Sequence, residues 1–222
     1  GQGVYSEGDN VVIQNNIVEK FTYMGVCAGG TQQTQYQGLV VAGNLIQKIH
    51  DLNQLGYGFA MYVQGTAGAI QNNVIVNSRT GVQIQPYRVV GAVPPVFSGN
   101  TVSAWRNAIY YNYAEEGASA WTISGNAVAA CVPPAAPTGP VVWEGISVET
   151  MRDTSNGGTI SGNSVDGTVA MTDASHAGWG GFPNAVWGLH YKGAASTSEK
   201  VVFTGNTVDN VSLGFVHDAP AD

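Results

Sequence analysis

A six-residue pattern that returns seven times constrains the fold more than any other feature of this 222-residue chain. The pattern is apolar, any residue, Gly or Asn, Asn, any residue, apolar. Its copies are IQNNIV (13–18), VAGNLI (41–46), IQNNVI (70–75), FSGNTV (97–102), ISGNAV (123–128), ISGNSV (160–165) and FTGNTV (203–208). Successive asparagines at its fourth position are 28, 29, 27 and 26 residues apart, and then 37 and 43. A repeat of this kind indicates a stack of similar coils.

A second pattern keeps phase with the first. A Gly or Ala is followed by an apolar residue, any residue and usually another apolar residue. The copies lie at 3–6, 25–28, 58–61, 81–84, 108–111, 145–148, 188–191 and 214–217. Alternation of apolar residues predicts short, half-buried strands, and no helical periodicity competes with it. Each repeat therefore holds several short strands separated by tight turns, which predicts an all-β parallel β-solenoid.

These two patterns together resemble the single-stranded right-handed parallel β-helix of the pectin-lyase-like superfamily, most closely phage tailspikes and secreted polysaccharide-active domains. The resemblance implies about seven coils of three short strands, with Asn at one turn of each coil. We expect residues 1–222 to form a single β-helix domain with long loop insertions at 131–144 and 168–187. Neither end carries an amphipathic helix that could cap an open solenoid, so we also expect a segment of a longer protein, further capping domains or a homotrimer.

The repeated asparagines are expected to be structural. Asn tolerates left-handed backbone angles at a sharp turn, and the preceding Gly or Asn would relieve crowding. The Asn side-chain amide can also bond to the equivalent Asn of the next coil.

Composition excludes several classes of partner. The chain has only 8 Lys and Arg residues, a net charge of −7 and no basic cluster, which argues against nucleic acid. No apolar run reaches the roughly 18 residues of a membrane span, so we expect no membrane insertion. His176 and Asp173 lie three residues apart without further ligands nearby, so we expect no metal and no cofactor.

The outward face of the Gly-apolar strand is the candidate binding surface, because polysaccharide-active β-helix proteins usually use this face and its loops. If the first residue after Gly points inward, the second and fourth point outward. The candidate carbohydrate-binding residues combine aromatic rings with amides: Tyr62, Gln83, Gln85, Tyr110 and Asn112, with Trp179 from the second insertion. Sugars stack on rings and pair with amides. The alternative is an ordinary solvated sheet face.

Candidate catalytic residues lie beside the two insertions, since long loops on a rigid scaffold often carry function. Glu149, Lys192 and Asp218 fall on three successive strands, and His190 shares their face. The hypothesis pairs Glu149 with Glu144 or Asp173 as two carboxylates, with His190 or Lys192 assisting as acid, base or charge. The alternative is a cross-strand ion ladder without catalytic function.

Two functions remain open on this reasoning. One is a carbohydrate-directed, tailspike-like domain that binds a surface polysaccharide and, if it is an enzyme, depolymerises it as a glycoside hydrolase or a lyase. The other is a non-enzymatic structural or adhesive solenoid in a larger assembly such as a virion or a cell surface. Both place the protein outside the cell or on the virion surface.

Overall fold

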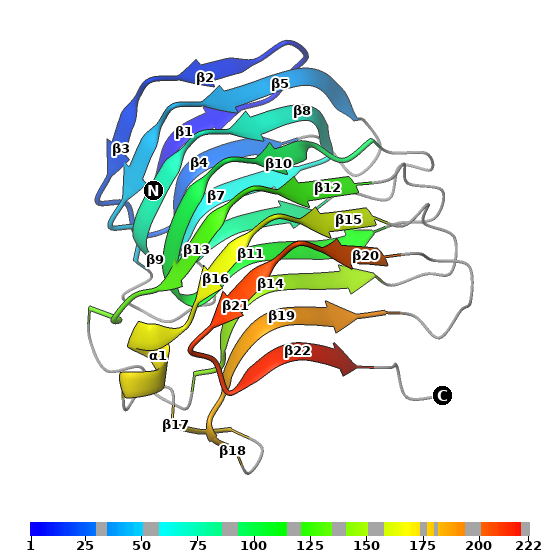
Figure 1. Ribbon diagram of the computed structural model, residues 1–222. Helices are drawn as coiled ribbons and strands as arrows, with labels where there is room; N and C mark the ends of the chain where they lie inside the picture. Colours follow the sequence, from blue (N-terminus) through cyan, green and yellow to red (C-terminus); the bar gives the residue numbers. More distant parts are fainter. Residues whose placement is uncertain are drawn as a thin grey trace.

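The computed structural model describes residues 1–29, 35–50, 58–85, 93–114, 121–134, 141–150, 158–173, 177–179, 182–193 and 201–218. Parallel strands in two long sheets make up nearly all of its regular structure (Figure 1). The prediction of an all-β fold built of parallel strands is therefore confirmed. None of the described residues forms a helix with the length and apolar character needed to cross a membrane.

The seven-stranded sheet holds the strand that precedes each repeated Asn. Every strand in it is parallel to the next. In spatial order its members are β2 (Val12–Gln14), β5 (Tyr36–Ala42), β8 (Thr66–Gln71), β10 (Val96–Ser98), β12 (Trp121–Ser124), β15 (Gly158–Ser161) and β20 (Val201–Thr204).

The second long sheet contains the two other kinds of strand. The strands that follow each Asn are β3 (Ile17–Glu19), β6 (Leu45–Gln47), β9 (Val74–Gln85), β11 (Thr101–Ala114), β13 (Ala127–Ala130), β16 (Ser164–Asp166) and β21 (Thr207–Asp209). The Gly-apolar strands are β1 (Gln2–Ser6), β4 (Met24–Gly29), β7 (Phe59–Gln64), β14 (Trp143–Thr150), β19 (Val186–Lys192) and β22 (Leu213–Asp218), together with the later parts of β9 and β11. Both kinds of strand pair in parallel from coil to coil.

The second insertion carries additional structure. The helix α1 (Thr168–Thr172) packs against β13, and β17 (Ala177–Trp179) pairs with β18 (Phe182–Asn184) as an antiparallel hairpin. In the first insertion, β14 begins at Trp143, so the last two residues of 131–144 belong to a strand and not to a loop. The Trp143 ring is fully buried, and its indole N–H donates to the backbone oxygen of Ala104 at 3.0 Å.

The repeated asparagines form one continuous ladder. Each donates its side-chain N–H to the side-chain oxygen of the next, at 2.9–3.1 Å, in the order Asn16, Asn44, Asn73, Asn100, Asn126, Asn163, Asn206. The same acceptor oxygen also receives the backbone N–H of the preceding Asn, for example Asn73 N–H to Asn100 at 2.9 Å. The predicted ladder is therefore present, and it satisfies polar groups that the turn would otherwise leave buried and unpaired.

The ladder asparagine is not the residue with left-handed backbone angles, contrary to the expectation from the sequence. The residue before the ladder asparagine has the positive φ, and it is always Gly or Asn: Asn15, Gly43, Asn72, Gly99, Gly125, Gly162 and Gly205. Gly and Asn tolerate this conformation at low cost, and turning the chain one residue earlier leaves the ladder asparagine directed into the stack.

Inward-pointing apolar side chains stack from coil to coil and form the core. In one such column, Val26, Met61, Val82, Ile109 and Ile146 are fully buried. Full burial of one such side chain stabilises the fold by about 1.5–3 kcal/mol. The residue before each of these is small because the chain bends there. A Cβ on Gly25 would lie 2.6 Å from the backbone oxygen of Ala60.

The strand register corrects one expected position. Ala60, and not Gly58, occupies the small position in β7, because Phe59 pairs with Met24 and Met61 pairs with Val26. The phase of this coil therefore shifts by two residues. Tyr62 belongs to the same outward column as Cys27 and Gln83, where Ala60 was expected.

Candidate functional site

The outer face of the Gly-apolar strands carries three columns of side chains that point away from the core. We call this surface the outer face. The first column is Gln2, Met24, Phe59, Thr80, Asn107, Glu144, Trp187 and Leu213. The second is Tyr5, Cys27, Tyr62, Gln83, Tyr110, Ser147, His190 and Val216, and the third is Gly29, Gln64, Gln85, Asn112, Glu149, Lys192 and Asp218. Except for Tyr62 and Gln64, which the phase shift in β7 moves, these are outward positions that the sequence predicts for the second and third columns.

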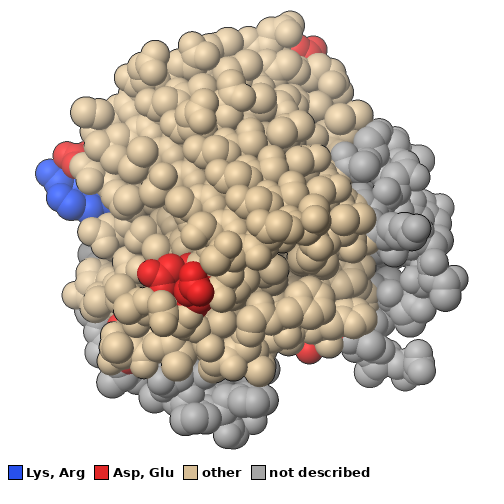
Figure 2. Space-filling model, viewed as in Figure 1, with Lys and Arg blue, Asp and Glu red and all other residues tan. Residues whose placement is uncertain are grey.

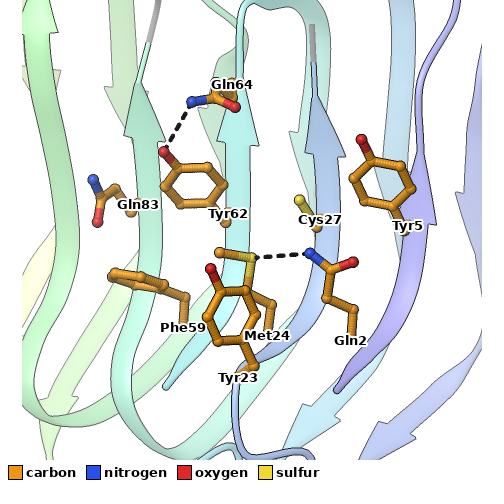
Figure 3. A pocket seen from close by; sticks show the side chains of 9 residues that line it. All are labelled: Gln2, Tyr5, Tyr23, Met24, Cys27, Phe59, Tyr62, Gln64 and Gln83. Atoms are coloured by element: carbon orange, nitrogen blue, oxygen red, sulfur yellow. Dashed lines mark hydrogen bonds between the residues drawn. The ribbon is translucent and has the colours of Figure 1, made fainter. Parts of the chain in front are cut away.

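Near the N-terminal end of the outer face, aromatic side chains surround a hollow of about 420 Å³ (Figure 3). We call it the aromatic hollow. Its lining combines rings and amides with no formal charge: Gln2, Tyr5, Tyr23, Met24, Cys27, Phe59, Tyr62, Gln64 and Gln83. Tyr62 donates its hydroxyl to Gln85 at 2.5 Å and accepts an amide hydrogen of Gln64 at 3.0 Å.

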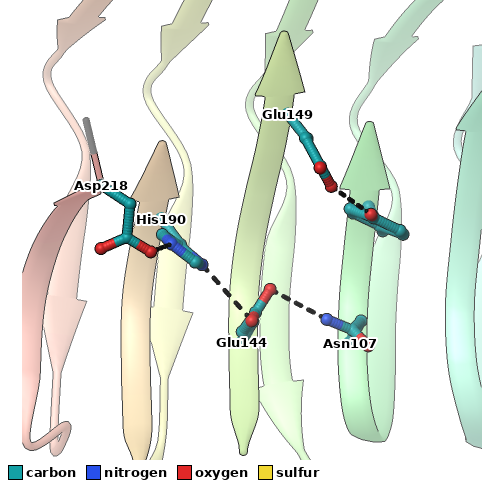
Figure 4. A network of polar contacts seen from close by, with 6 residues as sticks. Asn107, Glu144, Glu149, His190 and Asp218 are labelled. Carbon is teal, nitrogen blue, oxygen red and sulfur yellow. Dashed lines mark hydrogen bonds and ion pairs between the residues drawn. The ribbon is translucent and has the colours of Figure 1, made fainter. Parts of the chain in front are cut away.

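A polar network occupies the other half of the outer face (Figure 4). The Glu144 carboxylate accepts an amide hydrogen of Asn107 at 2.9 Å, and its other oxygen lies 3.3 Å from Nδ1 of His190. Nε2 of the same imidazole lies 2.9 Å from the carboxylate of Asp218. The imidazole ring thus links strands β14, β19 and β22 through two carboxylates.

A second contact in this region joins Tyr110 to Glu149. The Tyr110 hydroxyl donates to the Glu149 carboxylate at 2.6 Å, from β11 to β14. Both side chains are only half-buried. Lys192 is the register partner of Glu149 on β19, which places its positive charge on the neighbouring strand.

Burial and charge act in opposite directions on Glu144. Burial raises the pKa of its carboxyl, but the contact with His190 and smaller contributions from Ser147 and Lys192 outweigh burial and leave the pKa below its ordinary value. Glu144 is 8% exposed, whereas Asp218 at the other end of the imidazole has a 54% exposed side chain. Within this triad, the Asp218 carboxylate is therefore the one that solvent reaches.

Several residues expected on an open polar surface are in fact buried. Gln83 is 8% exposed, Asn112 is 7% exposed, and Ser147 and His190 are not exposed at all. Trp187 contributes to this burial, since its ring lies edge-on to the His190 ring with centroids 4.8 Å apart. This part of the outer face is consequently packed and not an ordinary solvated sheet.

The predicted catalytic residues separate into two groups. Glu144, His190, Glu149 and Lys192 lie on the adjacent strands β14 and β19. Asp173 lies at the C-terminal end of α1, where its backbone N–H donates to the oxygen of Val169 at 3.1 Å. Asp173 therefore lies on a different element from Glu149, its proposed partner carboxylate on β14.

The predicted carbohydrate-binding residues separate in the same way. Tyr62, Gln83, Gln85, Tyr110 and Asn112 lie on β7, β9 and β11 of the outer face. Trp179 lies on β17, in the hairpin outside this sheet, and His176 falls outside the described residues.

The sequence does not predict the aromatic hollow, nor does it predict Asn107 and Asp218 as members of the polar network. Asn107 and Gln2 occupy the first outward column, which the analysis of second and fourth positions did not include. Asp218 was placed on the correct face but not assigned to the site. Asn107 and Glu144 each directly precede the small residue of their strand, Ala108 and Gly145. This shared position is the sequence signal that they are register partners.

Among the residues that the structure describes, no three His, Cys, Asp or Glu side chains gather in a way that could hold a metal ion. The donors present on the outer face are side chains that can exchange protons or accept hydrogen bonds, namely a phenol, carboxylates, an imidazole and an amine. Carboxylates, an imidazole and an amine can act as general acids and bases.

Comparison with known proteins gives two matches. Residues 1–91 match a family described as a protein of unknown function (DUF1565). Among solved structures, the chain is similar to a double mutant of the periplasmic alginate epimerase AlgG, with 13% sequence identity and a TM-score of 0.48. That alignment covers 98% of this chain and 47% of the other, so this chain spans about half the length of its structural relative. No curated protein sequence matches.

Proposed function

We propose that this chain is a carbohydrate-directed domain that binds a polysaccharide across the outer face. The observation that supports this function is that two kinds of side chain follow one another from strand to strand along one sheet. Aromatic rings and neutral amides on β1, β7 and β9 are followed by Tyr110, Glu149 and the Glu144–His190–Asp218 triad on β11, β14, β19 and β22. Rings stack on sugar faces and amides pair with hydroxyls, while carboxylates and an imidazole provide acid–base groups.

In its detailed form, the proposal is a right-handed β-helix of about seven coils with three strands each, similar in role to a tailspike. The connections between parallel strands of one sheet are nearly always right-handed, which supports this hand. The domain would act outside the cell or on a virion surface, as a homotrimer or joined to further domains. Light scattering of the native assembly tests the trimer directly.

If the domain is an enzyme, Glu149 is the candidate catalytic carboxylate. It is half-buried, so a substrate can reach it, and it already accepts one hydrogen bond from Tyr110. Lys192 on the neighbouring strand would offset negative charge that develops nearby. Glu144 and His190 are more deeply buried and contact each other, so we assign them the role of holding the network in place.

The test measures cleavage and binding together. The wild type is incubated with a panel of surface polysaccharides, and both new reducing ends and the ultraviolet absorbance of an elimination product are followed. General acid–base catalysis contributes about 10²–10⁴-fold, so Glu149→Gln should reduce cleavage by at least 100-fold without changing glycan affinity more than severalfold. Glu19→Gln is the matched control, because Glu19 lies on β3 and pairs with Lys20.

A non-enzymatic adhesive solenoid is the second candidate. The observation that favours it is the engagement of the carboxylates by protein partners, with Glu144 held by Asn107 and His190 and Glu149 held by Tyr110. This alternative predicts glycan binding without any product. Cleavage that survives in Glu149→Gln would remove the catalytic assignment, and the absence of any bound glycan would refute both candidates.

A further inference from the structure

We infer that the aromatic hollow is a subsite for an uncharged segment of the glycan, separate from the acid–base network. This inference rests on the proposed function and names the class of sugar that the site selects. It follows from the spacing of two rings, from the way their hydroxyls are held, and from the lack of charge in the lining.

Two tyrosines stand on either side of the hollow with a small residue between them. Tyr5 on β1 pairs in register with Cys27 on β4, and Cys27 pairs with Tyr62 on β7. Neighbouring strands lie about 4.8 Å apart, so the two tyrosine positions are about 10 Å apart, roughly the span of a disaccharide. The short Cys27 side chain leaves space between the rings.

The hydroxyls of both rings are held by the protein. Tyr5 donates its hydroxyl to Glu7, and Tyr62 donates to Gln85. Tyr62 also accepts a hydrogen bond from Gln64 (Figure 3). The two hydrogen bonds of Tyr62 hold its ring before a ligand arrives, so little side-chain entropy of Tyr62 is lost on binding. Phe59 adds a further ring, tilted 39° to that of Tyr62 with centroids 5.5 Å apart.

The lining offers hydrogen-bonding groups that carry no charge. Within the described residues, the Gln83 amide has no hydrogen-bond partner, and it lies at the edge of the hollow (Figure 3). Burial and the nearby Glu7 raise the pKa of the Cys27 thiol to about 11, so the thiol stays neutral at ordinary pH. The hydrogen bond to Glu7, with a smaller contribution from burial, raises the pKa of Tyr5 to about 12.

An anionic sugar is poorly matched to this lining. A carboxylate that leaves water needs a cation or several donors in compensation, and among the described residues that line the hollow there is no Lys, Arg or His. Glu7 contacts the lining through Tyr5, and its carboxylate would repel an anion. Neutral hydroxyls meet no such penalty, because amides and phenols can exchange hydrogen bonds with them. Figure 2 shows the side of the molecule formed by the seven-stranded sheet, and not the outer face; few charged side chains lie on that side.

The test uses an array of acidic polysaccharides, each present in its native form and in a carboxyl-reduced, neutral form. The wild type should bind reduced forms at least as tightly as native forms. Affinity should change less than about twofold between 50 and 500 mM NaCl, because screening acts on charged contacts. Tyr62→Leu should weaken binding by about tenfold and Gln83→Ala by about threefold. The control Gln14→Ala, on the exposed surface of β2, should leave binding unchanged.

The outcomes separate this inference from the function on which it rests. A wild type that binds nothing on the array refutes the proposed function, and this inference with it. Preference for the acidic forms, a steep loss of affinity with salt, or equal binding by Tyr62→Leu and the wild type overturns the inference alone. In the last case, binding that still responds to Glu149→Gln would place the glycan on the acid–base network.

Discussion

Replacing Asn100 with alanine would interrupt the asparagine ladder near its middle. Asn100 is 1% exposed, and its side chain takes part in five hydrogen bonds. Its oxygen accepts the backbone and side-chain N–H groups of Asn73, both at 2.9 Å. Its amide nitrogen donates to Asn126 at 3.1 Å and to the backbone oxygens of Ile70 and Ser98, both at 3.0 Å.

The expected loss of stability follows from the groups left behind. The backbone N–H of Asn73 would remain buried without its acceptor, which costs about 1–3 kcal/mol, and the other lost bonds each contribute about 1 kcal/mol before relaxation. The Asn73 side chain keeps its bonds to Val41 and Gln71, which limits the total. We expect Asn100→Ala to lower the free energy of unfolding by about 4 kcal/mol, a large part of the 5–15 kcal/mol typical of a domain.

The measurement is urea unfolding followed by tryptophan fluorescence and circular dichroism, with unchanged m values as the check on the comparison. Asn16→Ala is the matched control at the same motif position. The Asn16 side chain is exposed and donates only to Gln14 and Asn44, and Asn44 keeps the backbone N–H of Asn16 as a donor. Asn16→Ala should lower the free energy of unfolding by less than about 1 kcal/mol. Equal effects of the two substitutions would refute the idea that the ladder satisfies buried groups.

Three further predictions concern the bend, the network and the hollow. Gly145→Ala should lower the free energy of unfolding by about 1–3 kcal/mol, since its Cβ would lie 2.6 Å from the backbone oxygen of Gly188, whereas Gly214→Ala meets no atom within 4 Å and should be nearly neutral in the same urea titration. Because the pKa of Glu144 is lowered in the folded protein, the ionised carboxylate stabilises the fold above pH 4.5, the ordinary pKa of the group, and this contribution is lost as the pH falls below 4.5. Glu144→Gln should therefore make Tm depend less steeply on pH below 4.5. An unchanged pH dependence of Tm in that range would contradict this. The raised pKa of Cys27, about 11, predicts slow alkylation by iodoacetamide at pH 8 that accelerates towards pH 11, and rapid reaction at pH 8 would contradict it.

The repeat allowed much of the scaffold to be predicted because one residue type performs one task in every coil. The seven asparagines identified the ladder, and the apolar residues after each small position identified the inward columns. The phase error in β7 has a simple cause. Ala60 can stand where most coils have Gly, and the nearby Gly58 offered a competing match to the same pattern.

The site was less predictable because it depends on contacts between strands that lie far apart in the sequence. Alternation gave the direction of His190 but not its two carboxylate neighbours, which come from residues 46 positions earlier and 28 positions later. Nor could it give the depth of His190, which packs against Trp187 on its own strand. Exposure depends on how neighbouring side chains cover a face, and periodicity does not encode this.

The asparagine ladder has a direction. From Asn16 to Asn206, every side-chain amide donates towards the later coil and accepts from the earlier one. Aligned hydrogen bonds polarise one another, so the array behaves as a chain of dipoles with an acceptor at the Asn16 side and a donor at the Asn206 side. Another coil can extend the array only if it continues the same orientation. Two such stacks could therefore join head to tail through their ladders, but not head to head.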